Sequence, residues 1–165
     1  MSKNYSLHLS AFRNGSLFLA VGILIFSLVT LAGSGCTSQP PQITVEGQYA
    51  NLSPMFFGVG SLFMKIKNAG GRDTLLAASV NIPAATVELH DIKDGKMVKV
   101  DRMKVPSRDT LELKPRSLHI MVFNMPKTVQ DGSDMLLTLT FERSGQLQVP
   151  VRFEKPKEIP MHGGN

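Results

Sequence analysis

The chain of 165 residues contains a single cysteine, Cys36, and no tryptophan. One thiol excludes an internal disulfide framework and any zinc site built from four cysteines. Charged residues make up only 19% of the chain and hydrophobic residues 42%, which excludes both a disordered chain and a wholly membrane-embedded one. The length fits one domain of the usual size, about 100–200 residues, with short additions.

A concentrated positive charge is also missing, although the formal net charge is +5. Two of the 18 basic residues, Lys3 and Arg13, precede Cys36, and no acidic residue does. The other basic residues are spread among 13 acidic ones without forming a basic cluster. Since proteins that bind nucleic acids gather Lys and Arg on one face, we expect no nucleic-acid partner.

Charge is absent altogether between Arg13 and Glu46, and within that gap residues 17–32 are nearly all apolar. A short basic flank, an apolar stretch and small residues next to a possible cleavage point are typical of a secretory signal. The stretch falls short of the ~20 apolar residues that a spanning helix needs. We therefore expect residues 1–36 to be a signal peptide that exports the rest of the chain.

The end of this segment, Leu31-Ala32-Gly33-Ser34-Gly35-Cys36, resembles a bacterial lipoprotein signal. The resemblance implies that Cys36 is lipidated and becomes the new N-terminus. It departs from the pattern at Gly33, where an aliphatic residue is usual, and an uncleaved N-terminal anchor is the alternative. Both interpretations predict an extracytoplasmic protein, in the periplasm or at the cell surface, that is held to the membrane by its N-terminal segment.

The rest of the chain divides into three parts. Residues 37–42 are polar and contain two prolines, which predicts a linker that does not pack. Residues 43–154 are expected to fold. Residues 155–165, with Pro156, Pro160 and a glycine-containing end, predict a flexible tail.

Short runs rich in Val, Ile, Leu, Phe and Thr recur from Gly60 onward and are separated by turn residues. No segment of ten or more residues has helical periodicity with start and stop signals. About seven or eight short strands at this spacing predict an all-β fold, a small antiparallel sandwich or barrel. The expected strands are 61–67, 74–80, 86–90, 97–100, 110–113, 118–123, 135–141 and 146–153.

The histidines of the expected folded part lie close to methionines. In a strand, positions i and i+2 share a face, so His119 and Met121 point the same way. Asp94-Gly95 predicts a two-residue hairpin, which places His90 and Met97 on one face as diagonal neighbours. Each strand pair thus offers one imidazole and one thioether.

Imidazole and thioether donors together indicate monovalent copper, because soft sulfur ligands select Cu(I). In an oxidising compartment an exposed thiol is liable to oxidation, so methionine is the safer sulfur donor. The alternative is that both histidines are ordinary surface or core residues and that Met121 fills the core. We expect other methionines of the folded part to be core residues: Met55, Met64, Met103, Met125 and Met135.

These positions resemble the signature of the PCu(A)C family of periplasmic copper chaperones, which is a His, ten residues, a Met, twenty-one residues and then His-x-Met. Residues 98–118 supply the twenty-one positions before His119-Ile120-Met121. The similarity covers roughly residues 43–153. Only six residues, 91–96, separate His90 from Met97, four fewer than in the family. An even deletion at a hairpin tip leaves the facing of both strands unchanged.

The resemblance implies a cupredoxin-like antiparallel β-sandwich with Greek-key topology that binds Cu(I) through His90, Met97, His119 and Met121. Met103 is the substitute for Met97 if the hairpin register differs. The resemblance also implies delivery of copper to an acceptor, a respiratory oxidase subunit or a thiol-containing intermediary. In the tail, Met161 and His162 are similar to the His/Met-rich extensions of some members, which implies a secondary copper site with Cu(II) as one candidate ion.

Three other functions are alternatives to copper delivery. A blue-copper electron carrier needs a cysteine thiolate at the metal, and the single cysteine lies at the signal boundary. An enzyme is not expected, because the sequence has no recognisable nucleophile–base spacing, phosphate loop or His-Glu helix motif. The remaining alternative is a lipid-anchored β-sandwich without metal that serves as a binding or structural protein.

Overall fold

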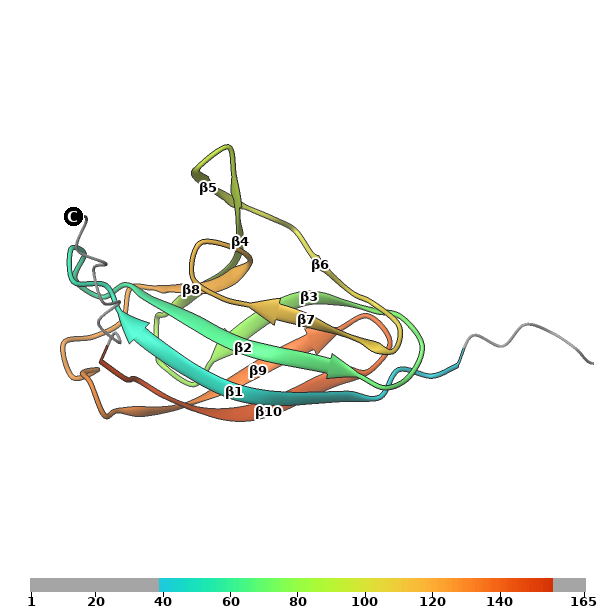
Figure 1. The fold of residues 1–165 in the computed structure, drawn as a ribbon. Coiled ribbons are helices and arrows are strands. Elements are labelled where there is room, and N and C mark those ends of the chain that lie inside the picture. Colours follow the sequence, from blue (N-terminus) through green and yellow to red (C-terminus); the bar gives the residue numbers. More distant parts are fainter. Residues whose placement is uncertain (1–38, 156–165) are drawn as a thin grey trace, which may run out of the picture. The chain divides into compact units, whose positions relative to one another are not determined.

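Runs of alternating apolar and polar residues build ten strands in residues 39–155, the part of the chain that the computed structural model describes (Figure 1). The strands are β1 (Ile43–Leu52), β2 (Gly60–Asn68), β3 (Asp73–Val80), β4 (Thr86–Lys93), β5 (Lys96–Lys99), β6 (Met103–Val105), β7 (Asp109–Leu113), β8 (His119–Phe123), β9 (Asp134–Phe141) and β10 (Gly145–Arg152).

The strands form two sheets. One has the order β1-β2-β8-β4-β5, with β7 also paired to β2, and the other has the order β10-β9-β3-β6. Strand β2 pairs with β8 along its first half, where Leu62 lies opposite Ile120, and with β7 along its second half. All strand pairs are antiparallel. The all-β, cupredoxin-like antiparallel sandwich expected from the sequence is confirmed.

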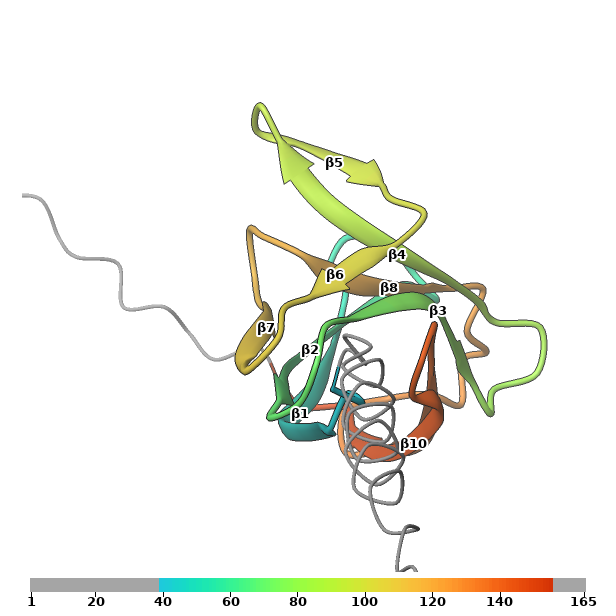
Figure 2. The same ribbon diagram turned by 90° about the vertical axis from the view of Figure 1, so that its right-hand side faces the viewer.

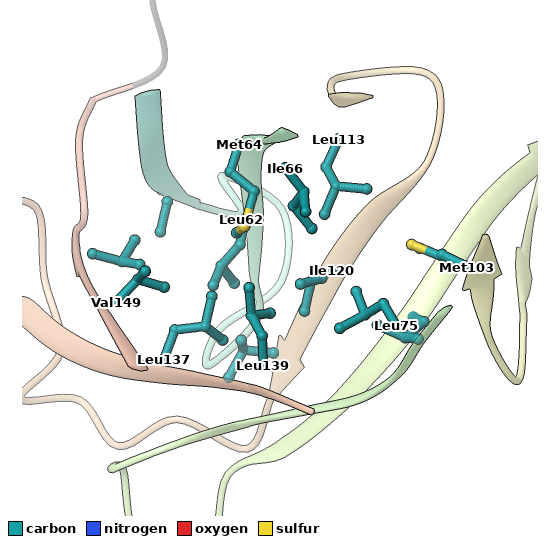
Figure 3. Packing of buried hydrophobic residues seen from close by; sticks show 14 of the residues in the cluster. Leu62, Met64, Ile66, Leu75, Met103, Leu113, Ile120, Leu137, Leu139 and Val149 are labelled. Carbon is teal, nitrogen blue, oxygen red and sulfur yellow. The ribbon is translucent and has the colours of Figure 1, made fainter. Parts of the chain in front are cut away.

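The core lies between the two sheets and follows from the period of two in each strand. In β9, Met135, Leu137, Leu139 and Phe141 alternate as buried residues with less buried ones. Figure 3 shows Leu137 and Leu139 meeting Leu62 of β2 between the sheets. Each of these leucines is completely buried, and burying a Leu side chain stabilises a fold by about 1.5–3 kcal/mol.

The β4–β5 hairpin has the register that the sequence predicted. Lys93 pairs with Lys96 across the two-residue turn, Ile92 with Met97, and His90 with Lys99. Asp94 and Gly95 have φ angles of 52° and 74°, the positive values that a type I′ turn requires at both central positions. The hairpin extends beyond the other strands of the sandwich (Figures 1 and 2).

The eight expected strands are observed, and two further strands, β1 and β6, were missed. The bulge between Glu46 and Tyr49, where Gly47 has a φ of 61°, interrupts the alternation of β1. Strand β6 has only three residues, too few to show a period. Both strands were missed because their sequences carry too little regular alternation.

The expectation that residues 37–42 do not pack is wrong for residues 39–42. The carbonyl groups of Pro40 and Gln42 accept hydrogen bonds from Gly71 and Ala69, at 3.0 and 2.9 Å. A Cβ on Gly70 would collide with the Pro40 carbonyl, so the turn after β2 needs glycine there to admit the incoming chain. This part of the linker is therefore attached to the sandwich.

Several expectations fall on residues 1–38 and 156–165, which lie outside the described residues. They are the signal peptide, lipidation at Cys36, and the tail site of Met161 and His162. Among residues 39–155, no helix has the length and apolar character needed to cross a membrane.

Candidate metal centre

Strand β8 turns two chemically different faces to its surroundings. Ile120 and Val122 point into the core, while His119 and Met121 lie on the outer face of the sheet. The outer face is nevertheless covered here, because His119 is only 4% exposed and Met121 only 7%. Antiparallel strands commonly bury only one face. Strand β8 buries both, and its outer face encloses the imidazole of His119 and the thioether of Met121.

The two histidines lie side by side on neighbouring strands. His90 of β4 is directly opposite His119 of β8, and their ring centroids are 5.9 Å apart with the planes tilted by 44°. His90 is 8% exposed. Phe63 and Phe123 lie next to the pair, with centroids 6.3 Å from His119 and 6.1 Å from His90 respectively. The two imidazoles are thus adjacent to each other and each lies next to a phenylalanine ring.

Each imidazole has one nitrogen engaged by the protein. Nδ1 of His119 lies 2.7 Å from the carbonyl oxygen of Ser117, and Nε2 of His90 lies 2.9 Å from a carboxylate oxygen of Glu88. A carbonyl or carboxylate oxygen only accepts hydrogen bonds, so both engaged nitrogens are donors. In the neutral rings, the lone pairs therefore sit on Nε2 of His119 and on Nδ1 of His90.

The free nitrogen of His90 is unusual for a buried group. Nδ1 of His90 is the buried side-chain nitrogen or oxygen atom that lacks a hydrogen-bond partner within residues 39–155. Leaving a buried acceptor unpaired costs about 1–3 kcal/mol. A metal ion that accepted this lone pair would remove the cost.

Glu88 is held as a carboxylate by its neighbours. Its second oxygen accepts a hydrogen bond of 2.8 Å from Nζ of Lys99. The hydrogen bond from Lys99, followed by that from His90, keeps the pKa of Glu88 below its ordinary value. The side chain is therefore ionised at neutral pH and acts as an acceptor toward His90.

The thioether of Met121 lies on the same face as the histidines. Ser61 of β2 is opposite Met121, and its hydroxyl donates a hydrogen bond of 3.1 Å to the sulfur. Thioether sulfur is a weak acceptor with a further lone pair, so a sulfur that accepts this hydrogen bond can still bind a soft ion.

Met97 is the most exposed of the four candidate ligands, at 51%. It lies on β5, opposite Ile92 and diagonal to His90, as the hairpin predicted. Met97 and Met121 line one apolar hollow of about 1000 Å³, together with Tyr49, Phe57, Phe63 and Phe123. The structure thus places His90, His119 and Met121 on one face of the neighbouring strands β4 and β8, and the more exposed Met97 on the same face of β5.

Met103, the substitute for Met97, lies elsewhere. It belongs to β6 of the other sheet, pairs with Leu75 and is 2% exposed in the core. The hairpin register that favoured Met97 over Met103 is the one observed. Met64, Met125 and Met135 are core residues as expected, but Met55 is 81% exposed in the loop between β1 and β2, so its assignment to the core is wrong.

Glu88, Ser61 and Ser117 contact the candidate ligands, and the sequence did not indicate these roles. Glu88 stands two positions before His90 and therefore shares its face, a signal that the rule for strands could have supplied. Ser61 contacts Met121 only through strand pairing, which no local pattern reveals. Within residues 39–155, no group of three or more His, Cys, Asp and Glu side chains is arranged to hold a metal ion, so the candidate set depends on its methionines.

Comparison with known proteins identifies the relatives of this chain. Residues 43–153 match the family described as "Putative lipoprotein LpqE-like". A curated relative, "Putative lipoprotein Lxx21020" of Leifsonia xyli subsp. xyli, is 24% identical over 102 residues, which are 58% of this chain and 61% of the relative. The chain thus spans about three fifths of the length of that relative.

Solved structures of PCuAC domains have the same fold. The copper-bound PCuAC domain from PmoF2 has a TM-score of 0.58 and 20% identity, covering 69% of this chain and 93% of that domain. The apo PCuAC domain from PmoF1 has a TM-score of 0.59 and 21% identity, covering 69% and 94%. Cu(I)-DR1885 from Deinococcus radiodurans has a TM-score of 0.58 and 18% identity, covering 77% and 87%. The chain therefore belongs to the LpqE-like family, and its folded part is a cupredoxin-like antiparallel β-sandwich of the PCuAC type.

Proposed function

We propose that this protein is an extracytoplasmic copper chaperone that binds Cu(I) through His90, Met97, His119 and Met121. The observation that carries the proposal is the pair of adjacent, buried imidazoles, each with one nitrogen engaged by the protein, together with Nδ1 of His90, which is buried without a hydrogen-bond partner in the described residues. Similar folds include a copper-bound PCuAC domain and a Cu(I)-bound form of DR1885.

The donor set suits a monovalent ion that is carried rather than used in catalysis. Two neutral imidazoles and two thioethers leave the site with the single positive charge of Cu(I), and sulfur donors favour this ion over harder ones. The exposure of Met97 puts one ligand within reach of an acceptor. A thiolate of the acceptor could replace that ligand first and draw the copper away.

The family and the curated relative are both described as lipoproteins, which supports lipidation of Cys36 and attachment to a membrane outside the cytoplasm. The acceptor in this proposal is a copper-binding protein, either a respiratory oxidase subunit or a thiol-containing intermediary, and the role is oxidase assembly. Met161 and His162 form a secondary copper site in the proposal, for Cu(I) or Cu(II).

The test is a competition for copper. The full chain receives one equivalent of Cu(I) under reducing conditions and is titrated with a chromophoric Cu(I) chelator. The double variant His119→Ala/Met121→Ala should lose the copper to chelator concentrations that the parent resists. Its circular dichroism should remain that of a folded protein, although its free energy of unfolding should fall, because shortening a buried Met to Ala costs about 2–5 kcal/mol.

A matched control removes the same two residue types elsewhere. The double variant Met161→Ala/His162→Ala should retain the first equivalent of copper as the parent does. If His119→Ala/Met121→Ala retains copper as well as the parent, the site assignment is wrong. If the parent itself retains no Cu(I), the protein is a β-sandwich without a copper function.

A further inference from the structure

The carboxylate of Glu88 joins the strands that carry the candidate ligands. One oxygen accepts a hydrogen bond from Nε2 of His90 at 2.9 Å, and the other accepts one from Nζ of Lys99 at 2.8 Å. Lys99 stands directly opposite His90 in the β4–β5 pair, and Glu88 itself stands opposite Met121 in the β4–β8 pair. Because both oxygens are engaged, the carboxylate has little freedom to turn away from His90.

This contact decides which nitrogen of His90 is available. A carboxylate accepts hydrogen bonds and donates none, so Nε2 carries the proton and Nδ1 carries the lone pair. Nδ1 is buried and without a partner among the described residues. Buried polar atoms are nearly always paired, and an unpaired one points to a missing ligand.

His119 is held in the opposite way. The carbonyl oxygen of Ser117 accepts the proton of its Nδ1 at 2.7 Å, which leaves the lone pair on Nε2. The partners thus select different tautomers for two rings whose centroids are 5.9 Å apart. The two histidines differ in the atom that each can offer to a metal ion.

We propose that Glu88 is a positioning residue that makes His90 an Nδ1 ligand, while the Ser117 carbonyl makes His119 an Nε2 ligand. Cu(I) is then bound by Nδ1 of His90 and by Nε2 of His119. The inference rests on the proposed function, because it names the ligand atoms of the same site. Lys99 supports Glu88 from the neighbouring strand and ties the position of the carboxylate to the hairpin that carries Met97.

Nitrogen-15 NMR of the full chain with labelled histidine tests this directly. Couplings from the ring protons distinguish protonated from unprotonated nitrogens, and the variants His90→Asn and His119→Asn assign the signals. In the copper-free protein with neutral rings, His90 should be protonated at Nε2 and His119 at Nδ1. On addition of one equivalent of Cu(I), the Nδ1 signal of His90 and the Nε2 signal of His119 should shift.

Variants of Glu88 separate positioning from general stability. Glu88→Ala should let His90 populate both tautomers and should weaken Cu(I) binding by about 10–100-fold, the usual cost of losing a partner that orients a metal-binding histidine. Glu88→Gln keeps an oxygen that accepts the Nε2 proton and should restore the tautomer and most of the affinity.

Glu112→Ala is the matched control. It removes a carboxylate of the same sheet that contacts Lys65 and Lys114 rather than a histidine, so the histidine signals and the copper affinity should not change.

The outcomes distinguish the two proposals. If the protein retains Cu(I) but His90 binds it through Nε2, or if Glu88→Ala changes neither tautomer nor affinity, this inference is overturned and the proposed function stands. If the wild-type chain retains no Cu(I), the proposed function fails and this inference fails with it. The spectra of the wild-type protein decide the ligand atoms even if Glu88→Ala does not fold.

Discussion

Two pairs of buried polar side chains in the described residues differ in how fully their polar atoms are hydrogen-bonded. Asn68 and Asp73 flank the turn between β2 and β3, and His90 and His119 lie on the outer face of β4 and β8; all four are at most 8% exposed. Asn68 uses both ends of its amide: Oδ1 accepts from Gln42 and Gly70 at 3.0 Å, and Nδ2 donates to Gly71 and Pro106 at 2.7 and 2.9 Å.

Asp73 is equally well satisfied. Its carboxylate accepts hydrogen bonds from the backbone N–H groups of Thr74, Arg143 and Ser144 and from the Ser144 hydroxyl. Each histidine, by contrast, has one ring nitrogen engaged by the protein, and the other nitrogen of His90, Nδ1, is buried without a partner in the described structure. Saturated groups such as Asn68 and Asp73 hold the fold, whereas half-engaged imidazoles are prepared for a ligand that the fold does not supply.

The largest expected effect is on the free energy of unfolding, and it comes from the pair Asn68 and Asp73. Asn68→Ala leaves the four backbone groups that it binds without their partner, and each buried unpaired group costs about 1–3 kcal/mol. Some of these groups will find water, so we expect a loss of about 3 kcal/mol in the free energy of unfolding, measured with urea. The Cu(I) affinity of the folded protein should not change. A parallel loss of affinity would show that the two regions are coupled.

The next largest effect is on the affinity for Cu(I), and a comparison of Met97 with Met103 measures it. Met97→Leu removes a proposed ligand. It should weaken Cu(I) binding at least as much as the loss of a residue that orients a ligand does, which is ~10–100-fold, and it should leave the free energy of unfolding nearly unchanged. Met103→Leu should do the reverse, with unchanged affinity and a stability change below about 1.5 kcal/mol, as volume-conserving core replacements give. Chelator competition and urea unfolding of both variants measure this. Equal affinities would remove Met97 from the site.

The third expected effect is a loss of stability in acid, through Asp73. Burial acts to raise the pKa of Asp73, but the hydrogen bonds from Ser144, Thr74 and Arg143 outweigh it, and the pKa in the folded protein is lowered. The stability that this shift contributes is complete above the ordinary Asp pKa of about 3.9 and is lost as the pH falls through the lower folded value.

Asp73→Asn should therefore be less stable than the parent at neutral pH, and its stability should fall less steeply below pH ~3.9. Urea unfolding at a series of pH values checks the slope. If parent and variant lose stability in parallel over that range, the carboxylate of Asp73 is not the group that responds.

The smallest effect is expected at Ser61. Its hydroxyl donates to the sulfur of Met121 at 3.1 Å and so competes with a metal ion for sulfur electron density. Ser61→Ala should raise the Cu(I) affinity by no more than about tenfold, since a hydrogen bond of this kind contributes about 0.5–1.5 kcal/mol at most. A lower affinity in the chelator competition would mean that the hydroxyl orients the thioether more than it competes.

Much of the architecture could be predicted because each strand repeats a simple period. The alternation of Ile120 and Val122 with His119 and Met121 gave both the strand and the shared face of the candidate ligands. Asp94-Gly95 determined the hairpin register, since few residues tolerate two successive positive φ angles. Local sequence was sufficient wherever local geometry decided the outcome.

The rest depends on contacts between distant segments. The attachment of residues 39–42 depends on Gly70 and Gly71. Exposure of Met55 follows from the course of the β1–β2 loop, which no alternation describes. The partners that set the tautomers of the two histidines are an exception: Glu88 and the Ser117 carbonyl each lie two positions before their histidine, so local sequence could have supplied them.

X-ray absorption at the copper edge tests the central claim most directly. The full chain is loaded with one equivalent of Cu(I) under reducing conditions, and the scatterers around the ion are counted. Coordination by His90, Met97, His119 and Met121 predicts two sulfur and two nitrogen neighbours. A shell without sulfur would contradict the account.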